Sequence, residues 1–164
     1  MPAPLTVVSG GQTGVDRAAL DVALELGLAC GGWCPRGRRA EDGRIPGRYP
    51  LRETPSAGYP QRTEWNVRDS DGTLVVTLGR PSGGTALTVR LAERLARPLL
   101  IVDLDGDPDP ASAAAWILGR ELRVVNVAGP RESDNRGLHP RAAAFLRQVL
   151  AEVVGSADGV SRRG

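Results

Sequence analysis

The sequence predicts a single α/β domain with a Rossmann-like, doubly wound, mostly parallel sheet flanked by helices. The chain has 164 residues, which is the size of one domain. Short apolar runs of strand length alternate with segments of helical periodicity along almost the whole chain. Short connections between such segments require right-handed crossovers and therefore parallel strands. We place the domain at residues 1–154 and expect residues 155–164 to form a disordered tail.

The first predicted unit is a strand followed by a helix. Residues 5–9 are apolar and rich in β-branched side chains, which favours a strand. Across residues 15–26 the apolar positions recur at the spacing of one buried helix face. We expect Thr13 to cap this helix, with Asp16 at its third position, and Gly27 to end it.

The next stretch is less regular. Residues 28–33 are predicted to form a second strand, and the glycines, prolines and arginines of residues 34–50 predict an irregular segment. A short strand is expected at residues 51–54 and a helix at residues 59–69.

The second half of the chain gives the clearest pattern. Residues 73–78 are apolar throughout, which is typical of a central strand covered on both faces. A helix follows from Thr85, and Pro98 ends it. The remaining predicted elements are a strand at 99–104, a helix at 110–119, a strand at 123–128, a polar loop at 129–137 and a helix from Pro140.

Composition excludes several classes of function. All 21 basic residues are Arg, so the chain has neither a Schiff-base lysine nor the lysine of a nucleotide-binding P-loop. A net charge of +2 does not indicate a nucleic-acid binder. Without a signal peptide or a membrane-length apolar run, the expected compartment is the cytoplasm, with no membrane contact. Cys30 and Cys34 are interpreted as reduced thiols, because a closed zinc site needs about four ligands.

Two glycine-rich turns each connect a predicted strand to a predicted helix: Gly10-Gly11-Gln12-Thr13-Gly14 and Ser82-Gly83-Gly84-Thr85. Ligands of doubly wound sheets bind at the carboxyl ends of the strands, where unpaired amides at helix starts attract anions. Together the turns predict a pocket for a phosphate-bearing small molecule, although either alone could be a simple tight turn. Neither has the dinucleotide pattern G-x-G-x-x-G, and we exclude a nicotinamide cofactor.

Few ionisable residues are candidates for catalysis. His139 is the single histidine, and a capping or surface role is favoured over a general base. Glu64 and Asp69 either face the pocket or belong to a solvated helix surface in which Glu64 pairs with Arg68. The arginines between Arg36 and Arg48 form either an oxyanion clamp or a solvated loop. No catalytic triad can be built from these residues, so binding is favoured over turnover.

Several segments resemble the molybdenum carrier proteins. The opening VSGGQTGVDRAAL at residues 8–20 carries the resemblance most clearly. It continues through GGWCPRGR at 31–38, AEDG at 40–43, RTEWNVRDSDGT at 62–73, the turn at 83–85 and NVAGPRES at 126–133. The resemblance covers residues 5 to 153.

The resemblance implies a cytoplasmic homo-oligomer, a dimer or tetramer, that holds molybdenum cofactor. This cofactor is a pyranopterin with a terminal phosphate and an oxo-molybdenum dithiolene, so the metal would arrive with the ligand. Proteins of cofactor synthesis and molybdenum enzymes are the implied partners. Which turn takes which end of the ligand stays open. The candidate binding residues are Gly10, Gly11, Gln12, Thr13, Arg17, Arg36, Arg62, Ser82, Gly83, Gly84 and Thr85.

Two alternatives follow from wider similarities. Phosphoribohydrolases of the lysine-decarboxylase-like superfamily, which release cytokinins, carry P-G-G-x-G-T followed by a catalytic glutamate. Residues 81–85 are similar, but no carboxylate follows them, so Glu64 with Arg62 would have to act instead. The first turn also resembles proteins that load single-stranded DNA, but an aromatic content of 4% offers few stacking platforms. A nucleotide sensor of unknown output is a further interpretation.

Overall fold

The computed structural model describes residues 5–161, with side chains to residue 156. Its strands are β1 Thr6–Val8, β2 Ala29–Gly31, β3 Trp33–Cys34, β4 Arg39–Ala40, β5 Gly43–Arg44, β6 Arg52–Glu53, β7 Gly72–Thr77, β8 Leu99–Asp103 and β9 Val124–Ala128. Its α-helices are α1 Val15–Glu25, α2 Tyr59–Arg68, α3 Gly83–Arg94, α4 Pro110–Gly119 and α5 Leu138–Ser161, and short 3-10 turns lie at Leu104–Gly106 and Glu132–Asp134.

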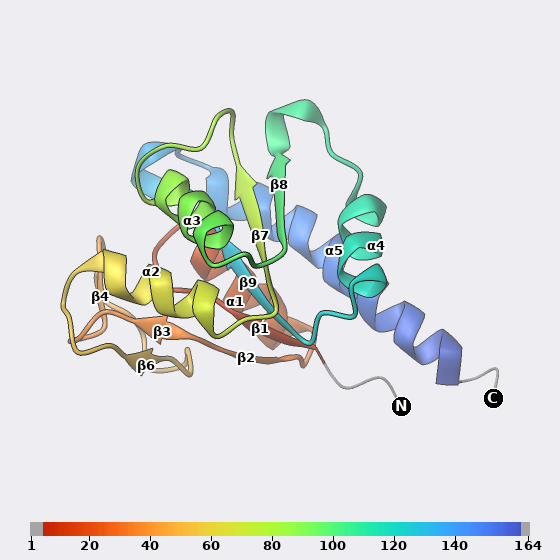
Figure 1. Cartoon of the computed structure of the whole chain (residues 1–164), viewed down its shortest axis with the longest axis horizontal. Coiled ribbons are helices and arrows are strands. Elements are labelled where there is room, and N and C mark those ends of the chain that lie inside the picture. Colours follow the sequence, from red (N-terminus) through yellow and green to blue (C-terminus); the bar gives the residue numbers. More distant parts are fainter. Residues whose placement is uncertain (1–4, 162–164) are drawn as a thin grey trace.

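Five strands form one parallel sheet in the order β2-β1-β9-β7-β8 (Figure 1). The register places Val7 beside Val125 and Val75 beside Ala128. Two small sheets lie outside it, the parallel pair β3-β6 and the antiparallel pair β4-β5. The predicted α/β class with a mostly parallel sheet is confirmed.

The strand order locates the place where a ligand would bind. Numbered with β9 as the first strand, and with β1, β2, β7 and β8 following, the order becomes 3-2-1-4-5. This is the order of the dinucleotide-binding fold, whose ligands lie where the direction of winding reverses. In this chain that point is the junction of β9 and β7. The last strand of the sequence therefore takes the central position of the sheet.

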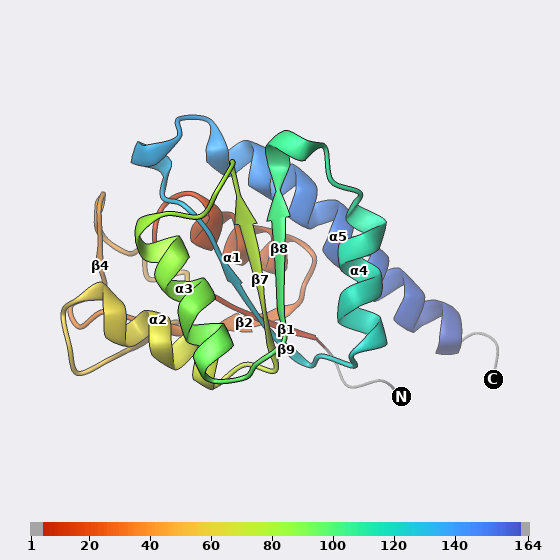
Figure 2. The ribbon, with the colours of Figure 1, turned by 45° about the horizontal axis from the view of Figure 1, so that its top comes forward.

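Helices cover both faces of the sheet (Figures 1 and 2). The helices α1, α4 and α5 lie on one face, where their apolar side chains join the largest buried cluster, and α2 and α3 lie on the other. All six residues of β7 are buried, as expected of a strand covered on both faces. The carboxyl end of β7 is thereby fixed between the two helical layers, and α3 begins a short loop later.

The segment after β3, predicted to be irregular, folds around one buried side chain. Arg38 is 9% exposed and donates to four backbone carbonyls, those of Ile45, Pro46, Tyr49 and Leu51, at 2.8–3.3 Å. The planar guanidinium can serve several acceptors at once, so it satisfies carbonyls that lie outside any ladder. Arg38 is a structural residue and belongs neither to an oxyanion clamp nor to a solvated loop.

Three local expectations are corrected. Gly14, with φ of 79°, precedes α1, whereas the Thr13 hydroxyl contacts Glu41 and accepts from the Glu132 amide. Helix α5 begins at Leu138, before the predicted start, and continues past Gly155 to Ser161. Residues 155–161 of the expected tail therefore lie in this helix, and residues 162–164 lie outside the described part of the chain. Within residues 5–161, no helix has the length and apolarity needed to cross a membrane.

Candidate functional site

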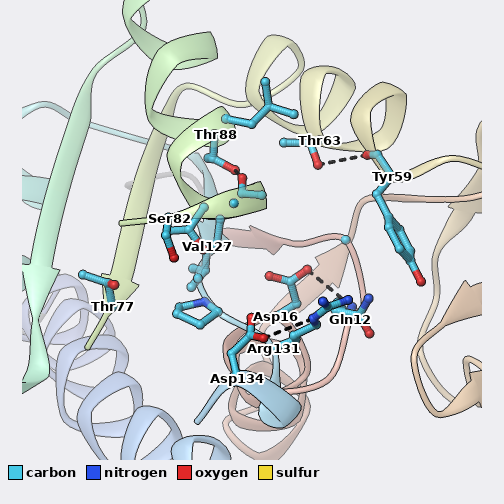
Figure 3. Close-up of a pocket in the computed structure, with 18 of the residues that line it drawn as sticks. Gln12, Asp16, Tyr59, Thr63, Thr77, Ser82, Thr88, Val127, Arg131 and Asp134 are labelled. Atoms are coloured by element: carbon cyan, nitrogen blue, oxygen red, sulfur yellow. Dashed lines mark hydrogen bonds and ion pairs between the residues drawn. The ribbon is translucent and has the colours of Figure 1, made fainter. Parts of the chain in front are cut away.

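A cavity of about 500 Å³ opens at the junction of β9 and β7. Its walls come from the turn after β1, helix α2, the start of α3 and the segments that follow β7 and β9. In Figure 3, Thr63 and Tyr59 on α2 and Ser82 and Thr88 at α3 face the turn that carries Gln12 across the cavity. The cavity thus lies where the strand order predicts a ligand site, and its volume suits a small molecule.

The turn before α3 presents unpaired amides. Gly83 and Gly84 are exposed and line the cavity, and neither amide donates a hydrogen bond to another described residue. Ser82 provides no side-chain cap for these amides. A Cβ at Gly83 or Gly84 would meet no atom within 4 Å, so the space above the turn is open. Such a helix start binds anions through its amides and its dipole.

The turn after β1 is different. Its Gln12 amide donates to the Asp16 carboxylate at 3.3 Å, and its Thr13 amide donates to the Gln12 side chain at 3.1 Å. A Cβ at Gly11 would lie 2.5 Å from Leu51 Cδ1, and one at Gly14 would lie 2.4 Å from the Pro130 carbonyl oxygen. Protein packing thus accounts for these glycines. The prediction that this turn offers unpaired amides to a ligand is wrong for Gln12 and Thr13.

At Gly10 the neighbour is an arginine. A Cβ there would lie 1.9 Å from Arg62 Nη1, because the guanidinium from α2 lies directly against the glycine. Nη1 also lies 3.1 Å from Asp16 Oδ2. The side chains of Arg62 and Asp16 are 13% and 5% exposed, so this is a largely buried ion pair in the cavity wall.

The pKa of the Asp16 carboxyl group is shifted from its ordinary value. Burial raises the pKa of its carboxyl group, opposed by the Arg62 guanidinium and by the backbone amides of Gln12 and Gly10. Arg62 is also incompletely satisfied, because its buried Nε has no hydrogen-bond partner in the described chain. An unsatisfied buried donor costs about 1–3 kcal/mol. This pair is therefore not optimised for stability alone.

Further arginines give the cavity a positive rim. Arg80, Arg90 and Arg131 line it together with Arg62. Arg131 is held by Asp134 and Glu41 at 3.5 and 3.6 Å, whereas Arg80 and Arg90 form no ion pair with any residue of the described chain. Guanidinium groups bind oxyanions through paired N–H donors, so the rim favours an anionic ligand.

The structure brings together most of the predicted site residues. Those that line the cavity are Gly10, Gln12, Arg62, Ser82, Gly83, Gly84 and Thr85. Those that do not line it are Gly11, Thr13, Arg17 and Arg36. Arg17 pairs with Asp42 beside the turn after β1, and Arg36 is exposed on the loop after β3.

The predicted acid–base candidates lie outside the cavity lining. Glu64 pairs with Arg94 at 3.5 Å rather than with Arg68, whose partner is Asp69 at 2.7 Å. His139 Nε2 lies 2.8 Å from Asp21 at the junction of α1 and α5, a structural contact. The hydrolase alternative is not favoured, because its substitute carboxylate Glu64 does not reach the cavity.

The two cysteines are free thiols, Cys30 half-buried and Cys34 buried. Burial raises the pKa of both thiols. Among the described residues, no group of three or more His, Cys, Asp and Glu is placed to hold a metal ion.

Sequence reasoning missed two buried polar residues of the cavity, Asp16 and Asn126. Asn126 is 2% exposed in the middle of β9, and its amide donates to Thr73 on β7 at 3.3 Å. A polar side chain inside the apolar run VVNVA is a signal that the sequence does contain. Asp16 was interpreted as a helix cap, and its partner Arg62, 46 residues away, carries no local signal.

Comparisons with known proteins agree with this architecture. Residues 7–150 match the circularly permutated YpsA SLOG family, cpYpsA. The crystal structure of a putative molybdenum carrier protein from Syntrophus aciditrophicus SB is 43% identical to this chain, with a TM-score of 0.85. The alignment covers 91% of this chain and 96% of that one. No curated protein matches.

The family description names a circular permutation, and in this chain the last strand, β9, occupies the place of a first strand in the sheet. The chain therefore belongs to the circularly permutated YpsA SLOG family, and its resemblance to the molybdenum carrier proteins is confirmed.

Proposed function

We propose that the cavity binds molybdenum cofactor, a phosphate-bearing pyranopterin, and that the protein carries or stores it. The observation that carries this proposal is the pair of unpaired, exposed amides of Gly83 and Gly84 at one side of a cavity with arginines around it. The similarity to a protein named a molybdenum carrier supports the choice of ligand.

The two turns suggest an orientation for the ligand. We assign the terminal phosphate to the start of α3, where Gly83 and Gly84 offer unpaired amides, open space and the positive end of the helix dipole, next to Thr85. The oxo-molybdenum end then lies toward Arg62, because the Gln12 and Thr13 amides of the turn after β1 already donate within the protein. Arg80 and Arg90 are assigned to the remaining negative charge at the rim. The metal would arrive held by the cofactor's dithiolene.

Three of the predicted binding residues do not line the cavity and would instead support the turn that does: Gly11, Thr13 and Arg17. Arg17 donates to the Gly11 carbonyl at 3.1 Å and pairs with Asp42, which fixes the turn. Arg36 lies on the exposed loop and could reach the ligand only from outside the lining. The cytoplasmic homo-oligomer and its exchange partners, cofactor-synthesis proteins and molybdenum enzymes, remain parts of the proposal.

A binding screen tests the ligand. Purified protein is titrated with isolated molybdenum cofactor, with nucleoside monophosphates and with molybdate. We expect the cofactor to bind most tightly and Gly84→Asp to abolish its binding, because a carboxylate would occupy the phosphate position. Gly119→Asp, at another open helical glycine outside the cavity, is the matched control and should bind normally. Preference for a nucleoside monophosphate, or unchanged affinity in Gly84→Asp, would contradict the proposal.

A further inference from the structure

The cavity wall contains a carboxylate in a position unusual for an anion site. Asp16 is 4% exposed and lies in the first turn of α1, where its carboxylate accepts the Gln12 amide and the Arg62 guanidinium. A negative charge beside the group that would bind an anion should oppose binding. Its presence there needs an explanation beyond the capping of α1.

The geometry of Arg62 gives the first part of this explanation. Asp16 engages only Nη1, and the same contact holds the guanidinium against Gly10, where an added Cβ would lie 1.9 Å from Nη1. Nη2 makes no hydrogen bond within the described chain and is not among its buried unpaired atoms, so it is the edge available to a ligand. Asp16 thus fixes one edge of the guanidinium and leaves the other open.

The charges around Asp16 give the second part. The charged group in contact with its carboxylate is Arg62 from α2. From the loop after β9, Arg131 and Asp134 line the same cavity but pair with each other at 3.5 Å. An anion bound to Arg62 would cancel the positive charge that keeps Asp16 ionised. Burial already raises the pKa of Asp16, so the loss of this field favours protonation.

We infer that Asp16 is a positioning residue that presents Arg62 to the anionic ligand and that binds a proton when the anion arrives. This inference deepens the proposed function, since it concerns the end of the cavity opposite the α3 turn. It requires only that an oxyanion binds at Arg62, whatever molecule carries it. Anion binding would then be coupled to proton uptake, and affinity would fall as the pH rises.

Sulfate is the appropriate probe, because it does not titrate between about pH 4 and pH 8, whereas a phosphate monoester does. Proton uptake on adding sulfate is measured by calorimetry in two buffers of different ionisation enthalpy across that range. Wild-type protein should take up protons, and Arg62→Gln should lose both sulfate affinity and uptake. Asp16→Asn should take up none and should bind sulfate with little change between the two ends of the range.

Glu25→Gln is the matched control, because Glu25 also pairs with an arginine, Arg147 at 3.0 Å, but lies outside the cavity. It should show wild-type uptake. If Asp16→Asn does not fold, the Asp16 carboxyl carbon of wild-type protein is followed by NMR, and sulfate should raise the pKa of this carboxyl group.

Three results would each overturn the inference. They are sulfate binding that is absent or independent of Arg62, no proton uptake by the wild-type protein, and an Asp16 pKa that sulfate does not change. Failure of the cofactor to bind, with sulfate-linked uptake intact, would instead contradict only the proposed function.

Discussion

The contact between Gly10 and Arg62 predicts a specific effect of adding one methyl group. In Gly10→Ala the new Cβ would lie 1.9 Å from Arg62 Nη1 and 2.8 Å from its Cζ. These atoms end a flexible side chain, so the guanidinium should move and the backbone should remain. The move separates Arg62 from Asp16, whose side chain is 5% exposed and would lose its ion-pair partner.

The cost of this separation can be bounded. Breaking a fully buried pair costs about 3–5 kcal/mol, and the 13% exposure of Arg62 reduces this, so we expect about 2 kcal/mol. For a domain of this size the midpoint of thermal unfolding should fall by roughly 4–8 °C. Gly84→Ala is the control, because its Cβ meets no atom within 4 Å and its helical backbone suits alanine, which should stabilise the protein by roughly 0.4–1 kcal/mol.

Urea unfolding of Gly10→Ala, Arg62→Ala and the double variant measures the coupling. Once Arg62 is truncated, the added methyl group has nothing to displace, so the double variant should be no less stable than Arg62→Ala. The two single effects should therefore not add. Additive effects, or a Gly10→Ala protein as stable as wild type, would refute the account of this contact.

Three further predictions concern the same region. Arg38→Ala should destabilise the protein by about 3 kcal/mol or more, because four backbone carbonyls lose their donor. Arg36→Ala, at an exposed position, should change the stability little. The midpoints of urea unfolding distinguish the two variants, and equal midpoints would refute the structural role of Arg38. Burial raises the pKa of Glu41, but hydrogen bonds from Ser133 and Thr13 outweigh it and lower this pKa below its ordinary value of 4.5. The carboxylate should therefore stabilise the protein above pH 4.5, and this stabilisation should be lost as the pH falls through the folded pKa. Glu41→Gln should flatten that part of the stability–pH curve. For Asp16 the pH dependence is opposite, because folding raises the pKa of its carboxyl group. Its contribution to stability should be complete below pH 3.8 and should be lost as the pH rises through the folded pKa. Asp16→Asn should remove this loss of stability. An unchanged curve in either variant would contradict the corresponding assignment.

The strands and helices of the main sheet were predictable because their signals are local. The apolar run at residues 73–78 corresponds to β7, and the leucines after Thr85 correspond to the buried side of α3. Strand order has no such signal. Periodicity identifies β9 as a strand, but only packing among distant segments places it at the centre, between β1 and β7.

The candidate site shows the same limit. By sequence the two glycine-rich turns were equivalent, yet Leu51 and Arg62 pack against the first, whereas nothing packs against Gly84. The sequence does not distinguish a glycine that leaves space for a ligand from one that leaves space for a neighbouring side chain. The small and charged composition from Gly155 onward predicts a tail, but α5 continues through this glycine to Ser161.

The most direct test is a crystal structure of the protein soaked with molybdenum cofactor, with anomalous data collected at the molybdenum edge. We predict phosphate density within hydrogen-bond distance of the Gly83 and Gly84 amides, and an anomalous peak on the Arg62 side of the same cavity. A ligand bound elsewhere on the molecule, or a phosphate seated on the turn after β1, would contradict the account.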